Sequence, residues 1–291
     1  MNKFSIKDIE NLSGIKAHTL RIWEQRYSIL IPKRKDSNHR FYDDDDLKHL
    51  LRIAYLYHHG IKISKIARLK IDELRQTALN ISVSDTTYNH FINQLLEASL
   101  DFDEIKFEEV FEQAIQKEGI ENVILNIIYP YMEKVGLLWL TDHVIPAQEH
   151  FTSNLINRKI IRAIDELPYE YSRGKKDILL FTPPKEHHEI PLLFIQYLLR
   201  KNGNKVTYYG TNISIADMKP YCDALPVTHL HFHLLTNLTS LNMNEYVIRL
   251  HQAFPDKQIV ASGPKTKEVT INLPNVRLLR SMDELLSYTN E

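Results

Sequence analysis

Residues 5–50 decide the fold of the amino-terminal part of the chain, and they read SIKDIENLSGIKAHTLRIWEQRYSILIPKRKDSNHRFYDDDDLKHL. Apolar residues recur at three-residue intervals from Ile6 to Leu12, which predicts a short helix. Ser5 and Asp8 have the spacing of a capping box at its start. Ser13-Gly14 predicts the turn that ends it. The stretch therefore opens with one capped helix and a turn.

The rest of this stretch predicts a second helix, a β-wing and a third helix. The second helix runs from about Lys16 to Tyr27, where Leu20 and Trp23 continue the apolar stripe. Residues 32–40, PKRKDSNHR, are basic and rich in turn formers, and Phe41-Tyr42 follows them, as suits a wing. Four aspartates at 43–46 then open a helix at its positive end, where the helix dipole favours acids. Two short helices followed by a wing form a winged helix-turn-helix.

The charge of the chain is divided unevenly. Residues 1–75 hold 16 Lys and Arg against 10 Asp and Glu, a net charge of +6, while the remainder holds 20 against 27, a net charge of −7. A basic terminal unit on an acidic body indicates that nucleic acid meets the amino-terminal end.

The second helix is the one that a helix-turn-helix places in the major groove. Its polar side chains are able to meet base edges or phosphates, and the wing is expected to grip the backbone. The expected DNA contacts are Lys16, His18, Thr19, Arg21, Arg26 and Tyr27 of the helix, with Lys33, Arg34, Lys35, Arg40 and Tyr42 of the wing.

The first 75 residues resemble the MerR family. The resemblance rests on the Ser-Gly turn, on Thr-Leu-Arg-x-Trp-Glu-x-Arg-Tyr at 19–27, on the basic wing, on Arg-Phe-Tyr at 40–42 and on the acid-capped helix. It implies a domain that binds double-stranded DNA as a dimer, joined to a carboxyl-terminal part that senses a signal.

Two further regions follow. From 87 to 168 the pattern is helical throughout, with four helices expected, so we expect a bundle. After the polar linker at 168–176 the period changes. Strands are expected at 177–181, 206–209, 229–235, 259–261 and 276–279, with helices at 189–202, 214–222, 242–253 and 282–289. This alternation predicts a flavodoxin-like, doubly wound parallel sheet. The expected domains are 1–75, 87–168 and 176–291.

Two groups of residues between 87 and 291 are candidates for ligand binding. Glu186-His187-His188 comes just after the first strand, at the edge where doubly wound sheets bind ligands. Glu186 is placed to hydrogen-bond the ring of His188 and to fix its tautomer for metal ligation. By itself, a Glu-x-His pair is more often an ordinary surface pair. The second group is Trp139 with Glu149-His150.

Residues 87–291 resemble the cobalamin-binding unit of the light-sensing MerR regulators. Their Trp-x9-Glu-His motif matches Trp139, Glu149 and His150, and their Glu-x-His-x-x-Gly motif matches Glu186 and His188. The resemblance implies that His188 is the lower axial ligand of cobalt. It places Trp139, Glu149 and His150 over the upper face, around the adenosyl group of adenosylcobalamin.

The chain departs from that pattern at several positions. Pro191 stands where the family has Gly, which would disturb the loop or the next helix. His233 stands where the family has a Ser that supports the ligand relay. Ser262-Gly263 replaces a Gly-Gly near the nucleotide tail, and a side chain there would crowd the tail. Leu140 replaces a His that ligates cobalt after photolysis, and His143 does not align with that role.

The leading interpretation is a cobalamin-responsive, repressing MerR-type regulator that forms a dimer or tetramer. One alternative keeps the DNA binding but makes the carboxyl-terminal part a cofactor-free module for oligomerisation or for docking a regulatory protein. Another is a component of a cobalamin-dependent enzyme, but the chain has little length left for a catalytic domain. Fold alone would not establish that chemistry.

The composition of the chain indicates the cellular location that we expect for the protein. Cys222 is the single cysteine, which excludes an internal disulfide framework and a multi-cysteine zinc site. The first ten residues lack the apolar region of a signal peptide, and no run of 18 apolar residues predicts a membrane helix. We therefore expect a cytoplasmic protein that lies at the nucleoid and has no membrane partner.

Overall fold

The computed structural model describes residues 3–13, 15–30, 33–34, 40–58, 60–71, 73–74, 77, 87–140, 146–168, 176–235 and 242–291. Only the backbone is described at residues 11, 12, 34, 40, 44, 48, 55, 58, 87, 136–140 and 146. The chain divides into two compact units, Met1–Leu155 and Ile156–Glu291, with the division inside one long helix. No helix in these described ranges combines the length and the apolar character that crossing a membrane requires.

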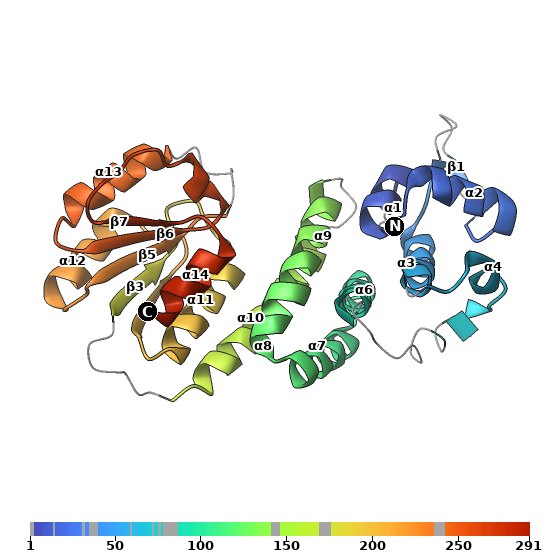
Figure 1. Cartoon of the computed structure of the whole chain (residues 1–291), viewed down its shortest axis with the longest axis horizontal. Helices are drawn as coiled ribbons and strands as arrows, with labels where there is room; N and C mark the ends of the chain where they lie inside the picture. The colour runs from blue at the N-terminus through green and yellow to red at the C-terminus, as the bar shows by residue number, and fades with distance from the viewer. Residues whose placement is uncertain are drawn as a thin grey trace. The chain divides into compact units, whose positions relative to one another are not determined.

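The first unit begins with the predicted winged helix-turn-helix (Figure 1). Ser5 and Asp8 form the expected capping box, with N to O distances of 2.7 and 3.3 Å. The wing pairs antiparallel, Lys33 opposite Phe41. Trp23 is buried and packs edge-on against Tyr57 with ring centroids 4.8 Å apart. The elements are α1 (Ile6–Ser13), α2 (Ala17–Tyr27), β1 (Lys33–Arg34), β2 (Arg40–Phe41), α3 (Asp44–His58) and α4 (Ile63–Ile66).

The predicted helical region follows, and most of it lies in the same compact unit as the winged helix-turn-helix. Its core includes Tyr131, whose hydroxyl lies 2.5 Å from Ser99 Oγ, and burial raises the pKa of Tyr131 to about 12. The elements are α6 (Thr87–Leu100), α7 (Glu104–Glu118), α8 (Ile120–Val123), the π-helix η1 (Ile124–Ile128), α9 (Tyr129–Leu140) and α10 (Pro146–Asp165), which runs into the second unit.

The π-helix η1 (Ile124–Ile128), between α8 and α9, was not predicted from the sequence. Pro130 stands two residues after its end. A proline has no N–H to donate, and its ring pushes against the carbonyl of the residue four positions earlier, which here lies within the π-helix. A wider π turn relieves that clash without ending the helix. Helices α8, η1 and α9 therefore continue one another from Ile120 to Leu140.

The second unit contains a five-stranded, wholly parallel sheet in the order β4-β3-β5-β6-β7. Numbered within this sheet the order is 2-1-3-4-5, that of flavodoxin-like folds, which confirms the predicted class. The elements are β3 (Asp177–Phe181), α11 (Ile190–Lys201), β4 (Lys205–Gly210), α12 (Ile215–Ala224), β5 (His229–His233), α13 (Met243–Ala253), β6 (Gln258–Ser262), the 3-10 helix η2 (Pro264–Glu268), β7 (Val276–Leu279) and α14 (Met282–Asn290).

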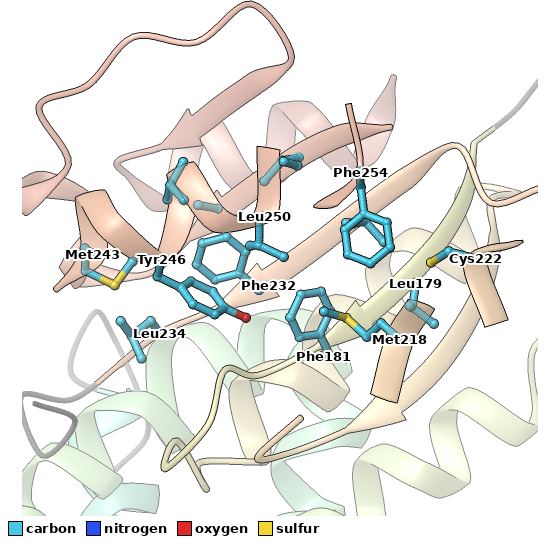
Figure 2. Close-up of a cluster of buried hydrophobic side chains, with 14 of the residues drawn as sticks. Leu179, Phe181, Met218, Cys222, Phe232, Leu234, Met243, Tyr246, Leu250 and Phe254 are labelled. Atoms are coloured by element: carbon cyan, nitrogen blue, oxygen red, sulfur yellow. The ribbon is translucent and has the colours of Figure 1, made fainter. Parts of the chain in front are cut away.

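Alternation along the strands supplies both faces of the sheet with apolar side chains. Leu179 and Phe181 join the cluster under α12 and α13 (Figure 2), while Ile178 and Leu180 join the one under α11 and α14. On β5 the residues that alternate with the histidines, Leu230 and Phe232, belong to the first cluster. The three histidines of β5 therefore point to the face that α11 and α14 cover.

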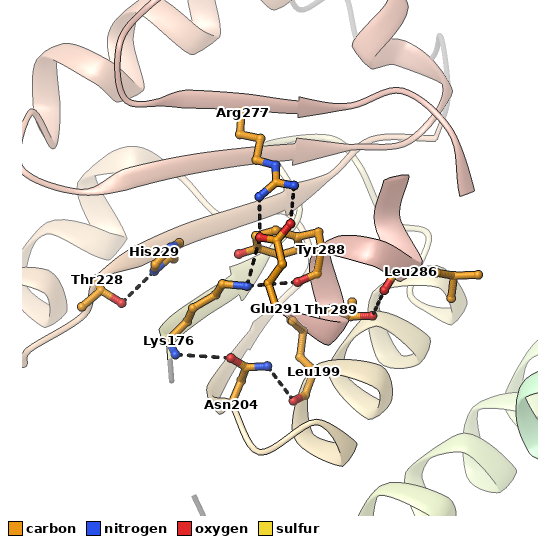
Figure 3. Close-up of polar contacts among 10 residues, drawn as sticks. All are labelled: Lys176, Leu199, Asn204, Thr228, His229, Arg277, Leu286, Tyr288, Thr289 and Glu291. Carbon is orange, nitrogen blue, oxygen red and sulfur yellow. Dashed lines mark hydrogen bonds and ion pairs between the residues drawn. The ribbon is translucent and has the colours of Figure 1, made fainter. Parts of the chain in front are cut away.

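The amino edge of the sheet is closed by polar contacts with the last helix (Figure 3). Lys176 donates to the carbonyl of Tyr288 at 3.0 Å and lies over its ring at 4.1 Å. Arg277 makes two 2.6 Å hydrogen bonds to the carboxylate of Glu291. These contacts occupy the amino edge, so the carboxyl edge is the one available to a ligand.

The expectation that Pro191 disturbs its surroundings is not met. Helix α11 begins at Ile190 and holds Pro191 in its first turn, where an N–H has no partner within the helix in any case. The backbone N–H of Leu193 still donates to the carbonyl of Glu189 at 2.9 Å.

Candidate nucleic-acid interface and ligand site

Helix α2 separates a buried face from an exposed polar one. Leu20 and Trp23 are 1% and 4% exposed and anchor the helix on the domain core. The predicted contact residues on α2 and just before it are exposed or half-buried, and they are Lys16, His18, Thr19, Arg21, Arg26 and Tyr27. The structure thus brings these six side chains together along one short helix.

Several of these side chains have neighbours within the domain. Lys16 Nζ lies 3.1 Å from a carboxylate oxygen of Glu10. The Arg26 guanidinium lies over the ring of Tyr27, 5.5 Å from its centroid. Both cations are exposed, so water screens these contacts and a DNA phosphate can compete for them.

In the wing, the structure describes the side chain of one predicted DNA-contacting cation, Lys33. Lys33 forms ion pairs with Asp43 and, at 3.7 Å, with Asp46. These two aspartates also cap the start of α3, each accepting a backbone N–H of the other at 3.0 Å. A phosphate at Lys33 would therefore compete with the acidic cap of α3. The side chains of Arg34 and Arg40 are not described, and Lys35 lies outside the described residues.

The structure corrects the expectation for Tyr42. Its side chain is 0% exposed, and its hydroxyl donates to Glu24 on α2. Its backbone forms a bridge with Phe4, with N to O distances of 2.8 and 2.9 Å. A phenol buried in this way positions α2 and does not itself reach DNA.

At the carboxyl edge of the sheet, Glu186 and His188 form a hydrogen-bonded pair. One oxygen of Glu186 lies 2.5 Å from His188 Nδ1 and accepts the backbone N–H of His188 at 3.1 Å. The other oxygen accepts the backbone N–H of Leu235 at 3.0 Å. The glutamate side chain is 1% exposed, whereas the histidine is 44% exposed. A carboxylate on Nδ1 places the lone pair of the neutral ring on Nε2.

The loop that carries this pair is fixed by a buried threonine. Thr182 Oγ1 donates to the carbonyl of Glu186 at 2.7 Å and accepts the N–H of Asn212 at 3.0 Å. Asn212 in turn accepts the N–H of Lys185 at 2.8 Å. Because of these bonds the loop after β3 holds the Glu186 carboxylate inside and His188 outside.

Beside this pair, Ser262 lies between two buried histidines. Its Oγ is 2.9 Å from His233 Nδ1 and 2.9 Å from His231 Nε2. Burial lowers the pKa of His231 to about 3 and that of His233 to about 4. Sequence reasoning singled out His233 and Ser262 but missed His231, although the alternation HLHFH at 229–233 places both histidines on one face of the strand.

Gly263 directly follows β6 and has a backbone conformation that other residues rarely adopt. Its φ is 102° and its ψ is 167°, a region that is essentially reserved for glycine. A Cβ there would lie 2.3 Å from the carbonyl oxygen of Leu234. Close approach of the two chain segments therefore requires glycine at this position.

The remaining predicted residues lie in the first unit. Glu149 lies in the first turn of α10 and His150 follows it, with His150 Nδ1 3.2 Å from a Glu149 oxygen. Ser153 donates to the same carboxylate at 2.6 Å. The His150 side chain is 76% exposed. Trp139 and Leu140 end α9 with only their backbone described, and His143 lies outside the described residues.

Comparisons with known proteins confirm the predicted combination of regions. Residues 4–70 match the model of the MerR HTH family regulatory protein, and residues 91–163 match that of a B12 binding domain. The HTH-type transcriptional repressor CarH of Myxococcus xanthus is 24% identical over 258 residues, which cover 87% of this chain and 85% of CarH. The repressor CarA of the same organism is 26% identical over 220 residues, 75% of this chain and 71% of CarA.

One solved structure has a fold similar to most of this chain. The monomethylamine corrinoid protein of Methanosarcina barkeri superposes with a TM-score of 0.51 at 12% identity, over 69% of this chain and 97% of that protein. At this identity the likeness is one of fold.

Proposed function

Because the chain joins a MerR-type helix-turn-helix to a B12-binding domain, we propose that it is a DNA-binding transcription repressor that responds to cobalamin. The similarity to two proteins named as transcriptional repressors, over most of the chain, supports repression. The observation that carries the cofactor part is the Glu186–His188 pair at the carboxyl edge of a flavodoxin-like sheet.

One side chain at the carboxyl edge, His188, is a suitable ligand for the cobalt of cobalamin. When bound, cobalamin would supply a cobalt ion, and a neutral imidazole is a common ligand for such a metal. His188 offers a half-exposed imidazole whose Nδ1 is held by a buried carboxylate, the arrangement that orients and strengthens metal-ligating histidines. In this proposal His188 is the metal ligand, Glu186 fixes its tautomer, and His233, Ser262 and Gly263 lie around the cofactor.

We also propose that residues of the helical region would hold part of the cofactor. Trp139 at the end of α9, with Glu149 and His150 at the start of α10, would cover the adenosyl group of adenosylcobalamin. The corresponding domains are 1–75 for DNA, 87–168 for the helical cover and 176–291 for the sheet.

A direct contact inside the first unit supports signalling from the cofactor region to DNA. Arg52 on α3 forms an ion pair with Glu97 on α6, and Glu97 also lies 3.3 Å from Lys106 Nζ. The Arg52 and Glu97 side chains are 14% and 16% exposed, so water screens the pair little. A movement of α6 would be transmitted to α3 of the DNA-binding domain. The proposal therefore assigns the chain a regulatory role, without enzyme activity, as a dimer or tetramer on DNA.

A second candidate keeps the DNA binding without the cofactor. It is favoured by Ser262, whose hydroxyl is engaged by two buried histidines at the end of β6. If these side chains exclude the cofactor, the second unit would act as an oligomerisation or docking module.

Purified full-length protein, mixed in the dark with adenosylcobalamin and passed through a gel-filtration column, tests the proposal. Cofactor absorbance that travels with the protein, together with a changed mobility shift of a random-sequence duplex pool, supports a cobalamin-responsive regulator. DNA binding with no retained cofactor at micromolar protein favours the second candidate. Loss of both contradicts the proposal.

A further inference from the structure

The outward face of α2 contains an isoleucine that the domain does not bury. Ile22 is 51% exposed, although it stands next to Trp23, which is 4% exposed. With Leu20 and Trp23 facing the core, the helical period of 3.6 places the outward direction near His18, Ile22 and Gln25. All three are exposed. Ile22 therefore projects from the side of α2 that faces away from its own domain.

The surroundings of Ile22 suit DNA as the covering partner. On the same side of α2 lie Arg21 and Arg26, both exposed, while Glu24, the acid of this helix, is engaged by the buried Tyr42. The exposed face thus carries positive charge and hydrogen-bonding groups around one apolar side chain. A protein partner with an apolar interface would ordinarily meet a larger apolar patch than this single residue.

We propose that Ile22 contacts the C5-methyl group of a thymine in the major groove and that Gln25, one turn further along, hydrogen-bonds an adenine edge. Thymine is distinguished in the major groove by its methyl group, and a glutamine is able to bond adenine N6 and N7 together. Ile22 and Gln25 are three positions apart and are neighbours on the helix surface. The pair makes α2 prefer A·T pairs at its centre. This inference rests on the proposed DNA-binding function.

The test begins with the full-length protein and a pool of random-sequence duplexes, selected with and without adenosylcobalamin. In the enriched duplex each thymine is replaced in turn by deoxyuridine, which removes only the methyl group. At one thymine of each half-site we expect affinity to fall roughly fourfold, the effect of one buried methyl group. The Ile22→Ala protein should bind the thymine and uracil duplexes equally at that position.

Gln25 is tested in the same way with 7-deazaadenine, which removes the N7 acceptor. The wild type should bind this duplex more weakly at one adenine, and Gln25→Ala should not distinguish the two duplexes. Ile105→Ala is the matched control, since Ile105 is 73% exposed on α7 and should leave all affinities unchanged.

The outcomes separate this inference from the function on which it rests. If no duplex is enriched and none is bound, DNA recognition itself fails. If the protein binds its enriched duplex but no thymine shows a methyl effect, the inference is wrong while the function stands. The inference is also wrong if Ile22→Ala lowers the affinity for the thymine and uracil duplexes by the same factor. The variant would then keep the wild-type preference for thymine, and Ile22 would act through helix stability.

Discussion

Glu186 and His188 are joined by a 2.5 Å contact between a carboxylate oxygen and Nδ1, and the carboxylate is buried while the imidazole is half-exposed. The second oxygen of Glu186 is anchored by the backbone of Leu235, beyond the end of β5. The orientation of the imidazole is therefore set by two strands at once. Such support fixes both the tautomer and the direction of a ligating histidine.

We predict that His188→Ala abolishes cobalamin ligation through imidazole, whereas Glu186→Gln weakens it roughly 10- to 100-fold, as loss of a carboxylate behind a ligating histidine usually does. The measurement is the absorbance spectrum of adenosylcobalamin bound in the dark, followed as a titration. His187→Ala is the control, because that neighbouring histidine is exposed and should bind cofactor as the wild type does. Unchanged spectra in His188→Ala would show that this histidine is not the ligand.

We predict that Gly263→Ala destabilises the protein by more than Gly119→Ala. Both glycines lie in a backbone region that costs other residues about 1–3 kcal/mol. A Cβ on Gly119 would meet no atom within 4 Å, whereas one on Gly263 would strike Leu234. Denaturant unfolding of both variants measures the difference. Equal losses would mean that the end of β6 relaxes to admit the methyl group.

We predict that Glu97→Gln loosens the contact between α3 and α6. The substitution replaces a charged hydrogen-bond acceptor of the largely buried Arg52 guanidinium with a neutral one, which costs about 1–3 kcal/mol. Amide hydrogen exchange in α3 and α6 should then accelerate roughly 10- to 100-fold, with α11 and α14 unaffected. Glu109→Gln, an exposed carboxylate on α7, is the control. If exchange does not change, the ion pair contributes nothing to the coupling of the two helices.

Much of the architecture could be predicted because its signals are local. The capping box of Ser5 and Asp8 lies within one helical turn, and the switch from helical to alternating patterns marks where the sheet begins. The Glu-x-His spacing likewise predicted the contact of Glu186 with His188. Each of these depends on residues close together in the chain.

Features that depend on distant residues were missed. Tyr42 was expected at DNA, but its bridge to Phe4 and its bond to Glu24 bring together three separate segments. His231 reaches Ser262 across neighbouring strands, a contact that the register of β5 and β6 creates. Neither register nor the exposure of a single helical residue such as Ile22 can be read from periodicity alone.

We predict that the two histidines on either side of Ser262, His231 and His233, make the stability of the protein depend on pH. Burial holds the pKa of His231 near 3 and that of His233 near 4, well below the value of about 6.5 in an unfolded chain. Between these values the unfolded protein binds more protons than the folded one, so the free energy of unfolding falls as pH is lowered. From about pH 7.5 to about pH 5 each histidine should contribute a loss of about 2 kcal/mol, and below their folded pKa values the loss should level off.

Unfolding by urea at several pH values, followed by far-ultraviolet circular dichroism, measures this loss, and NMR titration of the ring protons measures the two pKa values directly. His231→Phe keeps a ring beside Tyr288, which His231 meets edge-on at 5.4 Å, and removes one titrating group. From about pH 7.5 to about pH 5 its stability should therefore fall by about 2 kcal/mol less than that of the wild type, because His233 and His229, whose pKa burial also lowers to about 4, still titrate. His187→Ala should retain the full dependence, since its side chain is exposed in the folded state. A wild type whose histidines both titrate near 6.5 would show that the strand ends are open to water, and the closed arrangement around Ser262 would have to be abandoned.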